Sequence, residues 1–143
     1  MENIFLYTGG MIVIRTLTVK HQGDIVFSEG AGDLFAGEIN WRWVDFISPT
    51  EEEVKYLSSA FDFHHLAIED CLHGLQRPKA DDYGDYRFFV LHSPSEFGTL
   101  PYEINIFQGE KFIVTFHQRS SETIDSIWLQ LKENSERAEK GPE

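Results

Sequence analysis

The sequence predicts an α+β fold whose sheet is mixed and largely antiparallel. Short runs rich in β-branched and aromatic residues, separated by turn residues, indicate strands in both halves of the sequence. Between and after them, apolar residues recur at i, i+3 and i+7, which indicates amphipathic helices. Strands, then helices, then strands and a last helix suit an α+β domain. At 143 residues, the chain suits one domain, residues 1–143, with a substantial core.

The opening part of the sequence predicts a hairpin and a third strand. Residues 11–19 and 25–27 are the expected hairpin strands, and residues 21–24 are the turn between them. Residues 41–47 alternate apolar and polar side chains, which indicates a strand that leads into a helix. Asp45 is expected to accept hydrogen bonds near the end of this strand before it would ligate a metal, because Asp favours turns and caps.

A helix is expected to begin directly after this strand. Ser48 is the predicted N-cap, Pro49 suits the first helical position, and Glu51 can complete a capping box. Three apolar residues at i, i+3 and i+7 form its expected buried stripe: Val54, Leu57 and Phe61.

Strands return in the second half. They are expected at residues 86–91, 102–107 and 112–116, and residues 108–111 join the last two as a hairpin. His117, at the end of the last strand, is expected to be a core or edge histidine.

A last helix follows, with Ser120 or Ser121 as its expected cap. Its expected apolar stripe, with Trp128 beside it, contains Ile124, Ile127 and Leu131.

The composition is acidic, with 24 Asp and Glu residues against 12 Lys and Arg residues, a formal charge of −12. This charge argues against nucleic acid and anionic membranes as partners and favours attraction of cations. The single cysteine, Cys71, excludes an internal disulfide and suits a reducing compartment. No run approaches the roughly 18 apolar residues of a membrane helix, and the N-terminus lacks the basic region of a signal peptide. We therefore expect that this chain does not conduct ions by itself.

An amphipathic helix is expected after residue 64. Its apolar face should pack and consists of Ala67, Ile68, Cys71, Leu72 and Leu75. Cys71 is therefore interpreted as a packed thiol rather than a nucleophile or ligand. Leu66 falls within the polar face and is expected to be exposed. Gly74 is a plausible terminator, because the position after a helix favours left-handed backbone.

The polar face of this helix is the strongest candidate for chemistry. His65, Glu69 and His73 lie at i, i+4 and i+8, and Asp70 is adjacent to them. Oxygen donors suit magnesium, whereas imidazoles suit zinc, nickel or cobalt. A solvated helix face without any ligand explains the same pattern. Groups from one helix also do not close a site, because a structural zinc site typically takes four ligands.

Several motifs occur together in the central part of the sequence: Trp43-Val44-Asp45, His64, Glu69-Asp70, Gln76-Arg77-Pro78-Lys79 and the apolar strand at 86–91. Together they resemble the cytoplasmic N-terminal domain of CorA-type magnesium transporters, over about residues 40–140. The QRPK run after an ED pair and before an apolar strand is the most specific of them. The resemblance implies a three-layer α/β/α sandwich with helices on both faces of the sheet.

The resemblance also implies a function without catalytic residues. In this family the domain is the intracellular part of a homopentameric divalent-cation channel, at the cytoplasmic side of the inner membrane. A long helix and two membrane spans follow it, and they are absent from this chain. Asp70 matches the ligand that shares a regulatory magnesium ion with an acid of the neighbouring subunit, and the bound ion stabilises the closed channel. Glu69 could assist through a water molecule.

The identity of the metal stays open. Relatives commonly have Pro where His65 stands, and this histidine adds a nitrogen ligand. Cobalt, nickel or zinc could therefore replace magnesium, and a zinc-transporting relative of the same fold is the nearest alternative.

Two further classes of function compete with the transporter domain. A metal-dependent hydrolase would use His65, Glu69 and His73, but it needs a fourth ligand and a general base, and the sequence has neither an HExxH motif nor a nucleophile elbow. A plain interaction domain would use its acidity for solubility alone.

Arg77 is expected to have a structural role. No Gly-rich loop precedes a helix here, so phosphate binding by the QRPK run is not favoured. We expect Arg77 to pair with one acid of the corner that follows it: Asp81, Asp82 or Asp85.

Overall fold

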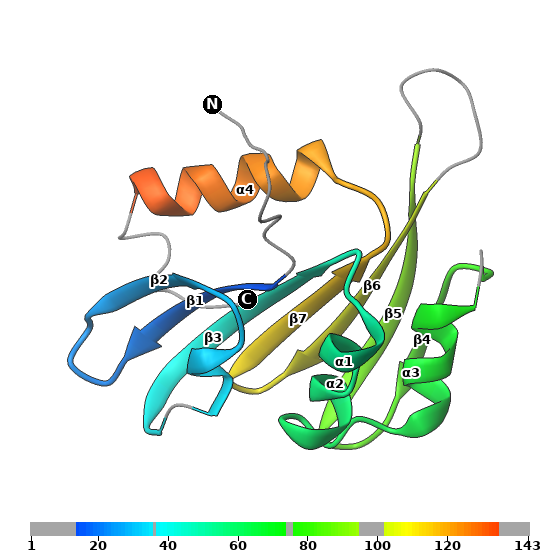
Figure 1. Cartoon of the computed structure of the whole chain (residues 1–143), viewed down its shortest axis with the longest axis horizontal. Helices are drawn as coiled ribbons and strands as arrows, with labels where there is room; N and C mark the ends of the chain where they lie inside the picture. Colours follow the sequence, from blue (N-terminus) through cyan, green and yellow to red (C-terminus); the bar gives the residue numbers. More distant parts are fainter. Residues whose placement is uncertain (1–13, 36, 74–75, 95–101, 135–143) are drawn as a thin grey trace.

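The computed structural model describes residues 14–35, 37–73, 76–94 and 102–134. Within these residues, seven strands form one sheet in the order β2-β1-β3-β7-β6-β5-β4 (Figure 1). Neighbouring strands are antiparallel except β3 and β7, which are parallel, so the predicted mixed and largely antiparallel sheet is confirmed. The strands are β1 Ile14–Lys20, β2 Ile25–Glu29, β3 Ile39–Ile47, β4 Lys79–Asp82, β5 Tyr86–Ser93, β6 Tyr102–Gly109 and β7 Phe112–His117.

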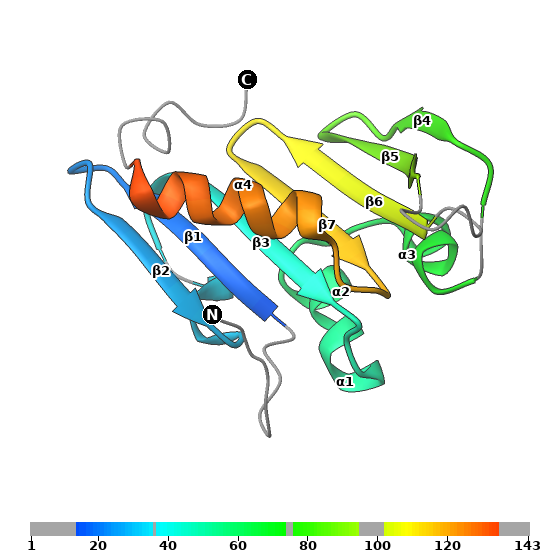
Figure 2. The ribbon, with the colours of Figure 1, turned by 90° about the horizontal axis from the view of Figure 1, so that it is seen from above.

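Helices cover both faces of this sheet, as the family resemblance implies. Seen from above in Figure 2, α4 (Glu122–Glu133) lies over the half of the sheet that contains β1 and β3. On the other face lie η2 (Gly32–Phe35), α1 (Glu51–Val54), α2 (Tyr56–Ser59) and α3 (His65–Leu72). The architecture is therefore a three-layer sandwich. None of the helices within the described residues is long and apolar enough to cross a membrane.

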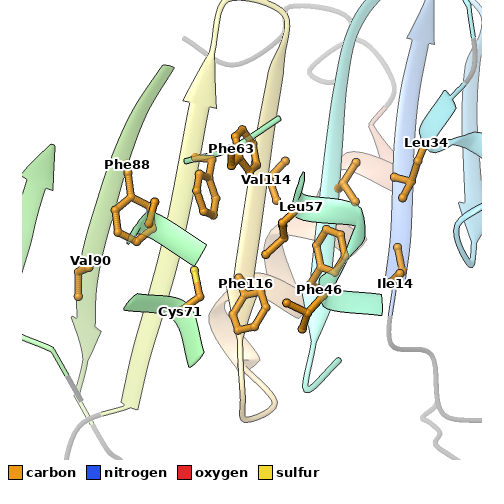
Figure 3. Close-up of a cluster of buried hydrophobic side chains, with 14 residues drawn as sticks. Ile14, Leu34, Phe46, Leu57, Phe63, Cys71, Phe88, Val90, Val114 and Phe116 are labelled. Carbon is orange, nitrogen blue, oxygen red and sulfur yellow. The ribbon is translucent and has the colours of Figure 1, made fainter. Parts of the chain in front are cut away.

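Each face of the sheet has its own core, because successive strand residues point to opposite faces. The larger core, shown in Figure 3, lies under η2 and α1 to α3 and contains Phe46, Leu57, Phe88 and Phe116. The second core lies under α4, where Trp128 packs edge-on against Trp43 with ring centroids 4.9 Å apart. These two cores hold the helix layers to the sheet.

The two predicted hairpins are confirmed. In the first, β1 pairs with β2 across a turn in which Gly23 has a φ of 92°, a conformation that glycine adopts without strain. In the second, β6 pairs with β7. The strand β4, at the edge of the sheet, was not predicted, because its sequence Lys-Ala-Asp-Asp has low β propensity.

The predicted start of the first helix is wrong by two residues. Ser48 has a φ of 44°, and its N–H donates to the carbonyl of His117 at 2.8 Å, so the chain still follows β7 at that point. Thr50 is the N-cap, and Glu53 completes a capping box with it. Both Ser48 and Thr50 precede a glutamate by three residues, so the sequence offers two equivalent capping boxes. The hydrogen bond of Ser48 to His117 keeps Ser48 beside β7 and leaves Thr50 as the N-cap.

Two side chains expected in the cores are exposed. Leu72 is 44% exposed, because it lies about 140° around the α3 axis from buried Ala67 and at the last residue of the helix. Ile127 is 46% exposed, because the buried face of α4 is centred between Ile124 and Trp128. Leu66, at 53% exposure, is exposed as predicted.

Other predictions for the helices are confirmed. Val54 and Leu57 are buried, and Phe61 is partly buried and packs against the same core. Ser121 caps α4, since its Oγ accepts from the N–H of Ile124 at 3.2 Å. Gly74 and Leu75 lie outside the described residues.

Candidate cation site on helix α3

The candidate site lies where α3 faces the edge strand β4. The helix begins at His65 because the ring of His64 caps it: Nδ1 accepts from the N–H of Leu66 at 3.1 Å. The helix is held to the sheet by buried Ala67 and by Cys71, whose pKa burial raises well above its ordinary value. Cys71 is thus a packed thiol, as predicted, and its neighbour Asp70 is carried to the side of β4.

Asp70 forms an ion pair with the ammonium group of a lysine of the same chain. Its Oδ2 lies 2.7 Å from Nζ of Lys79, the first residue of β4. The same ammonium lies 3.0 Å from Oδ2 of Asp81. The hydrogen bonds with Asp70 and then Asp81 raise the pKa of Lys79 above its ordinary value. Two carboxylates therefore converge on one cationic group, and the Asp70 side chain is still 25% exposed.

The other predicted ligands lie along the exposed side of the helix. Nδ1 of His73 is 3.9 Å from Oε1 of Glu69, and both side chains are more than half exposed. His65 is at the other end of the helix, where its ring stacks on that of His64 at a centroid distance of 4.5 Å. Among the described residues, no three His, Cys, Asp or Glu side chains are gathered closely enough to hold a metal ion.

The donor set of α3 and β4 fits part of a magnesium shell. Magnesium takes six oxygen ligands near 2.1 Å and keeps several waters, so proteins often supply only one or two carboxylates. Asp70 and Asp81 are two carboxylates that already face one cation, and Glu69 lies next to Asp70 on the helix. Here one chain offers two carboxylates, fewer oxygen ligands than a complete magnesium shell requires.

The QRPK run fixes the approach of β4 to α3. The backbone N–H of Gln76 donates to Oε1 of Glu103 at 2.6 Å, and its side-chain amide donates to the carbonyl of His73 at 2.6 Å. The carbonyl of Gln76 lies 2.6 Å from Nε2 of His92. These contacts tie the end of α3 to β5 and β6, and Lys79 follows three residues later. Pro78, exposed between them, lies in the irregular segment before β4.

The predicted pairing of Arg77 is wrong. Arg77 forms no ion pair with the three acids proposed for it, all of which are described, and Lys79 contacts Asp81 instead. Side chains alternate along β4, so Lys79 and Asp81 share the face that carries α3. A basic residue of the QRPK run therefore does pair with the acidic corner, but this residue is Lys79 and not Arg77.

A second acidic centre lies on the opposite face of the sheet. Asp45 is fully buried and accepts from Nε of Arg15 at 2.9 Å and from Oγ1 of Thr115 at 2.5 Å. Nε2 of His117 lies 2.8 Å from the carboxylate. The indole N–H of Trp43 donates to the same Thr115 hydroxyl at 3.0 Å. Trp43 and Asp45 of the sequence motif thus belong to one buried hydrogen-bond network.

The charges of this network shift two pKa values in opposite directions. Burial acts to raise the pKa of Asp45, but the attraction and hydrogen bond of His117, with Arg15 and Thr115, outweigh it, and the pKa is lowered. Burial acts to lower the pKa of His117, but Asp45 and the carbonyl of Arg119 outweigh it, and that pKa is raised. Both results describe an ionised pair under α4. Sequence reasoning predicted a hydrogen-bonding Asp45 but could not identify its partners.

Comparison with known proteins identifies the family. Residues 39–143 match the family model described as CorA-like Mg2+ transporter protein. The chain belongs to this family. The family resemblance inferred from the motifs is thereby confirmed, and the matched segment contains Asp45, Asp70 and Lys79.

Individual relatives agree with this assignment. The chain is 39% identical over 132 residues to YfjQ of Bacillus subtilis (strain 168), which is named as a metal ion transporter; the match covers 92% of this chain and 41% of YfjQ. This CorA-family chain therefore spans less than half the length of that relative. The family description and the name of this relative both refer to transport, which is compatible with the expectation that the chain is not an enzyme.

Solved structures show the same fold at low identity. The soluble domain of CorA from Methanocaldococcus jannaschii matches with a TM-score of 0.66 and 17% identity, covering 91% of this chain and 51% of that one. The ZntB cytoplasmic domain from Vibrio parahaemolyticus matches with a TM-score of 0.67 and 13% identity, covering 92% of this chain and 52% of that one. The same fold thus occurs in the CorA soluble domain and in the ZntB cytoplasmic domain.

Proposed function

We propose that this chain is the divalent-cation-sensing domain of a CorA-type magnesium transporter and lies on the cytoplasmic side of the membrane. In this proposal, magnesium binds through Asp70 between neighbouring subunits of a homo-oligomer, a pentamer by the family resemblance, and favours the closed channel. One observation carries it: Asp70 presents a partly exposed carboxylate that already holds a cationic group at the surface of α3. Membership of the CorA-like family supports the assignment of the domain to a magnesium transporter.

One chain supplies too few oxygen ligands at this site to complete a magnesium shell, so the proposal requires a second subunit. Asp70 is the direct ligand in this proposal, and Glu69 acts through a metal-bound water, because magnesium loses its hydration shell reluctantly. A carboxylate from a neighbouring subunit would complete the charge balance of the ion. The net charge of −12 raises the local concentration of cations around such a site.

The bound ion then acts through the repulsion that it removes. Two ionised carboxylates about 4 Å apart repel each other by about 4 kcal/mol at an effective dielectric constant near 20. Since about 1.4 kcal/mol changes an equilibrium constant tenfold, loss of the ion is sufficient to shift a closed assembly towards an open one. The transported ion is therefore also the effector in this proposal.

A second candidate keeps the domain and changes the ion. His73 places a ring nitrogen 3.9 Å from Glu69, and His65 is exposed at the start of the same helix. Nitrogen and oxygen donors together suit zinc, cobalt or nickel. The likeness to the ZntB cytoplasmic domain concerns the fold and is consistent with this alternative.

Calorimetric titration separates the two candidates. The wild-type chain, Asp70→Ala and His65→Ala would be titrated with magnesium and then with zinc, and sedimentation would follow association in parallel. Asp85→Ala, which removes an exposed acid from the loop between β4 and β5, is the matched control for the loss of one charge.

The proposal expects weak magnesium binding, or magnesium-dependent association, that Asp70→Ala removes and Asp85→Ala retains. Zinc binding that His65→Ala removes while Asp70→Ala leaves it unchanged would support the second candidate instead. Equal magnesium binding by the wild type and Asp70→Ala would contradict the proposed site.

A further inference from the structure

We propose that Lys79 is a built-in competitor for the divalent cation at Asp70, so that the cation binds by displacing the Lys79 ammonium towards Asp81. This inference rests on the proposed function, because it assigns a regulator to the same carboxylate. It concerns a residue that is neither a ligand nor part of the subunit contact in that proposal.

The geometry places Lys79 where a metal ion would have to bind. Its Nζ lies 2.7 Å from Oδ2 of Asp70, within the distance of a charge-assisted hydrogen bond. A cation that ligates this carboxylate through Oδ2 and the ammonium compete for the same oxygen and carry charge of the same sign. Binding of both together is therefore disfavoured.

The same geometry offers Lys79 a second partner. Oδ2 of Asp81 is 3.0 Å from the ammonium and lies on the same strand, two residues away. Lys79 can give up Asp70 and keep Asp81 without leaving the surface, because a lysine side chain has four flexible methylene groups. Its ammonium also lies over the ring of buried Phe88, 5.9 Å from the ring centroid.

The exposure of the pair makes the exchange reversible. The side chains of Lys79 and Asp70 are 37% and 25% exposed, and water can replace the contacts that are lost. Exposed ion pairs contribute up to about a fivefold change in an equilibrium constant, so Lys79 can weaken cation binding without preventing it.

Competition by an ammonium also discriminates between cations. A sodium or potassium ion brings the same single charge as Lys79 and no hydrogen bonds, so it gains little by displacement. A divalent ion brings twice the charge to the same carboxylate. Competition by Lys79 thus weakens the binding of monovalent ions at Asp70 more than the binding of divalent ions.

The test compares two single-charge removals in the same short segment. Lys79→Gln removes the competitor, and Arg77→Gln removes an equal charge from a residue that forms no ion pair with Asp70, Asp81, Asp82 or Asp85. Magnesium affinity would be measured by NMR titration of the 143-residue chain at constant ionic strength, with Asp70→Ala as the reference for the site. Lys79→Met, which retains most of the side-chain stem, serves as a second variant if Lys79→Gln alters the fold.

The inference expects Lys79→Gln and Lys79→Met to bind magnesium about two- to fivefold more tightly than the wild type. Arg77→Gln should change the affinity by clearly less. Equal tightening by Lys79→Gln and Arg77→Gln would show an effect of net charge and would overturn the inference.

A direct readout follows the ammonium itself. The side-chain nitrogen signal of Lys79 should shift as magnesium binds to the wild type and should not shift in Asp70→Ala. If magnesium binds through Asp70 and this signal stays in place, Lys79 is not displaced and the inference fails while the proposed site stands. If Asp70→Ala binds magnesium as the wild type does, the proposed site itself fails.

Discussion

Asp45 and Asp70 are both paired with a cationic side chain of their own chain, but their surroundings differ. Asp45 is fully buried under α4 and has three partners, among them the guanidinium of Arg15 at 2.9 Å. Asp70 is partly exposed beside β4 and has Lys79 as its cationic partner. Water cannot replace the partners of a buried charge, whereas it can replace those of an exposed one. The same chemistry therefore gives a structural centre at Asp45 and an exchangeable centre at Asp70.

The largest effect is expected for Asp45→Ala. This change leaves Arg15 and His117 without their shared carboxylate, and breaking a buried ion pair costs about 3–5 kcal/mol. Urea unfolding followed by circular dichroism would measure the loss. A cost below about 1 kcal/mol would contradict the structural interpretation of this centre.

The second effect is the pH dependence of stability. The pKa of His117 is raised above 6.5, so its contribution is complete below pH 6.5 and is lost as the pH rises through the folded-state value. The pKa of Asp45 is lowered below 3.8, so its contribution is present above pH 3.8 and is lost as the pH falls through its folded-state value. The pair should therefore stabilise the fold most between these limits.

Urea unfolding at pH 5.5 and at pH 8.5 would test this sign. The wild type should lose stability relative to His117→Gln as the pH rises, because the folded-state pKa of His117 is raised by Asp45. An identical pH dependence of the two proteins would show that His117 does not titrate against Asp45.

Removal of the helix cap should have an intermediate effect. Thr50→Ala removes the two contacts of the Thr50 hydroxyl, which accepts from the N–H of Glu53 and donates to its carboxylate, and should lower the free energy of unfolding by about 1 kcal/mol. Ser48→Gly is the matched change at the position that the sequence favoured, and it should not destabilise, since Ser48 has a φ of 44°. A larger loss from Ser48→Gly than from Thr50→Ala would contradict the observed helix start.

The smallest effect on stability is expected at the exchangeable centre. Asp70→Ala should change the free energy of unfolding by less than about 1 kcal/mol, because the pair with Lys79 is exposed to water. The comparison with Asp45→Ala, measured in the same urea series, is the control. Losses of equal size would remove the distinction between the two centres.

Local patterns predicted most strands, both hairpins and the burial of Cys71, because each depends on residues close together in the sequence. They failed where distant residues decide. Ser48 and Thr50 carry equivalent cap signals, and pairing of Ser48 with His117 chose between them. Leu72 matched an apolar face, but the helix ends there.

The candidate site shows the same limit. The helix pattern placed Asp70 beside a polar face, and the family resemblance singled out Asp70 and the QRPK run, but the pairing of Lys79 with Asp70 depends on how β4 returns beside α3. The partners of Asp45 lie 30 and 72 residues away, at Arg15 and His117. No local pattern relates such positions, although the acid in a strand indicated that some partner was required.

The most direct test of the central claim is paramagnetic NMR with manganese, which prefers oxygen ligands as magnesium does. Substoichiometric manganese added to the wild-type chain should broaden the amide signals of α3 and β4 and leave those of α4, on the opposite face, sharp. Asp70→Ala should abolish this selective broadening. Broadening centred on another part of the chain, or unchanged in Asp70→Ala, would contradict a cation site at Asp70.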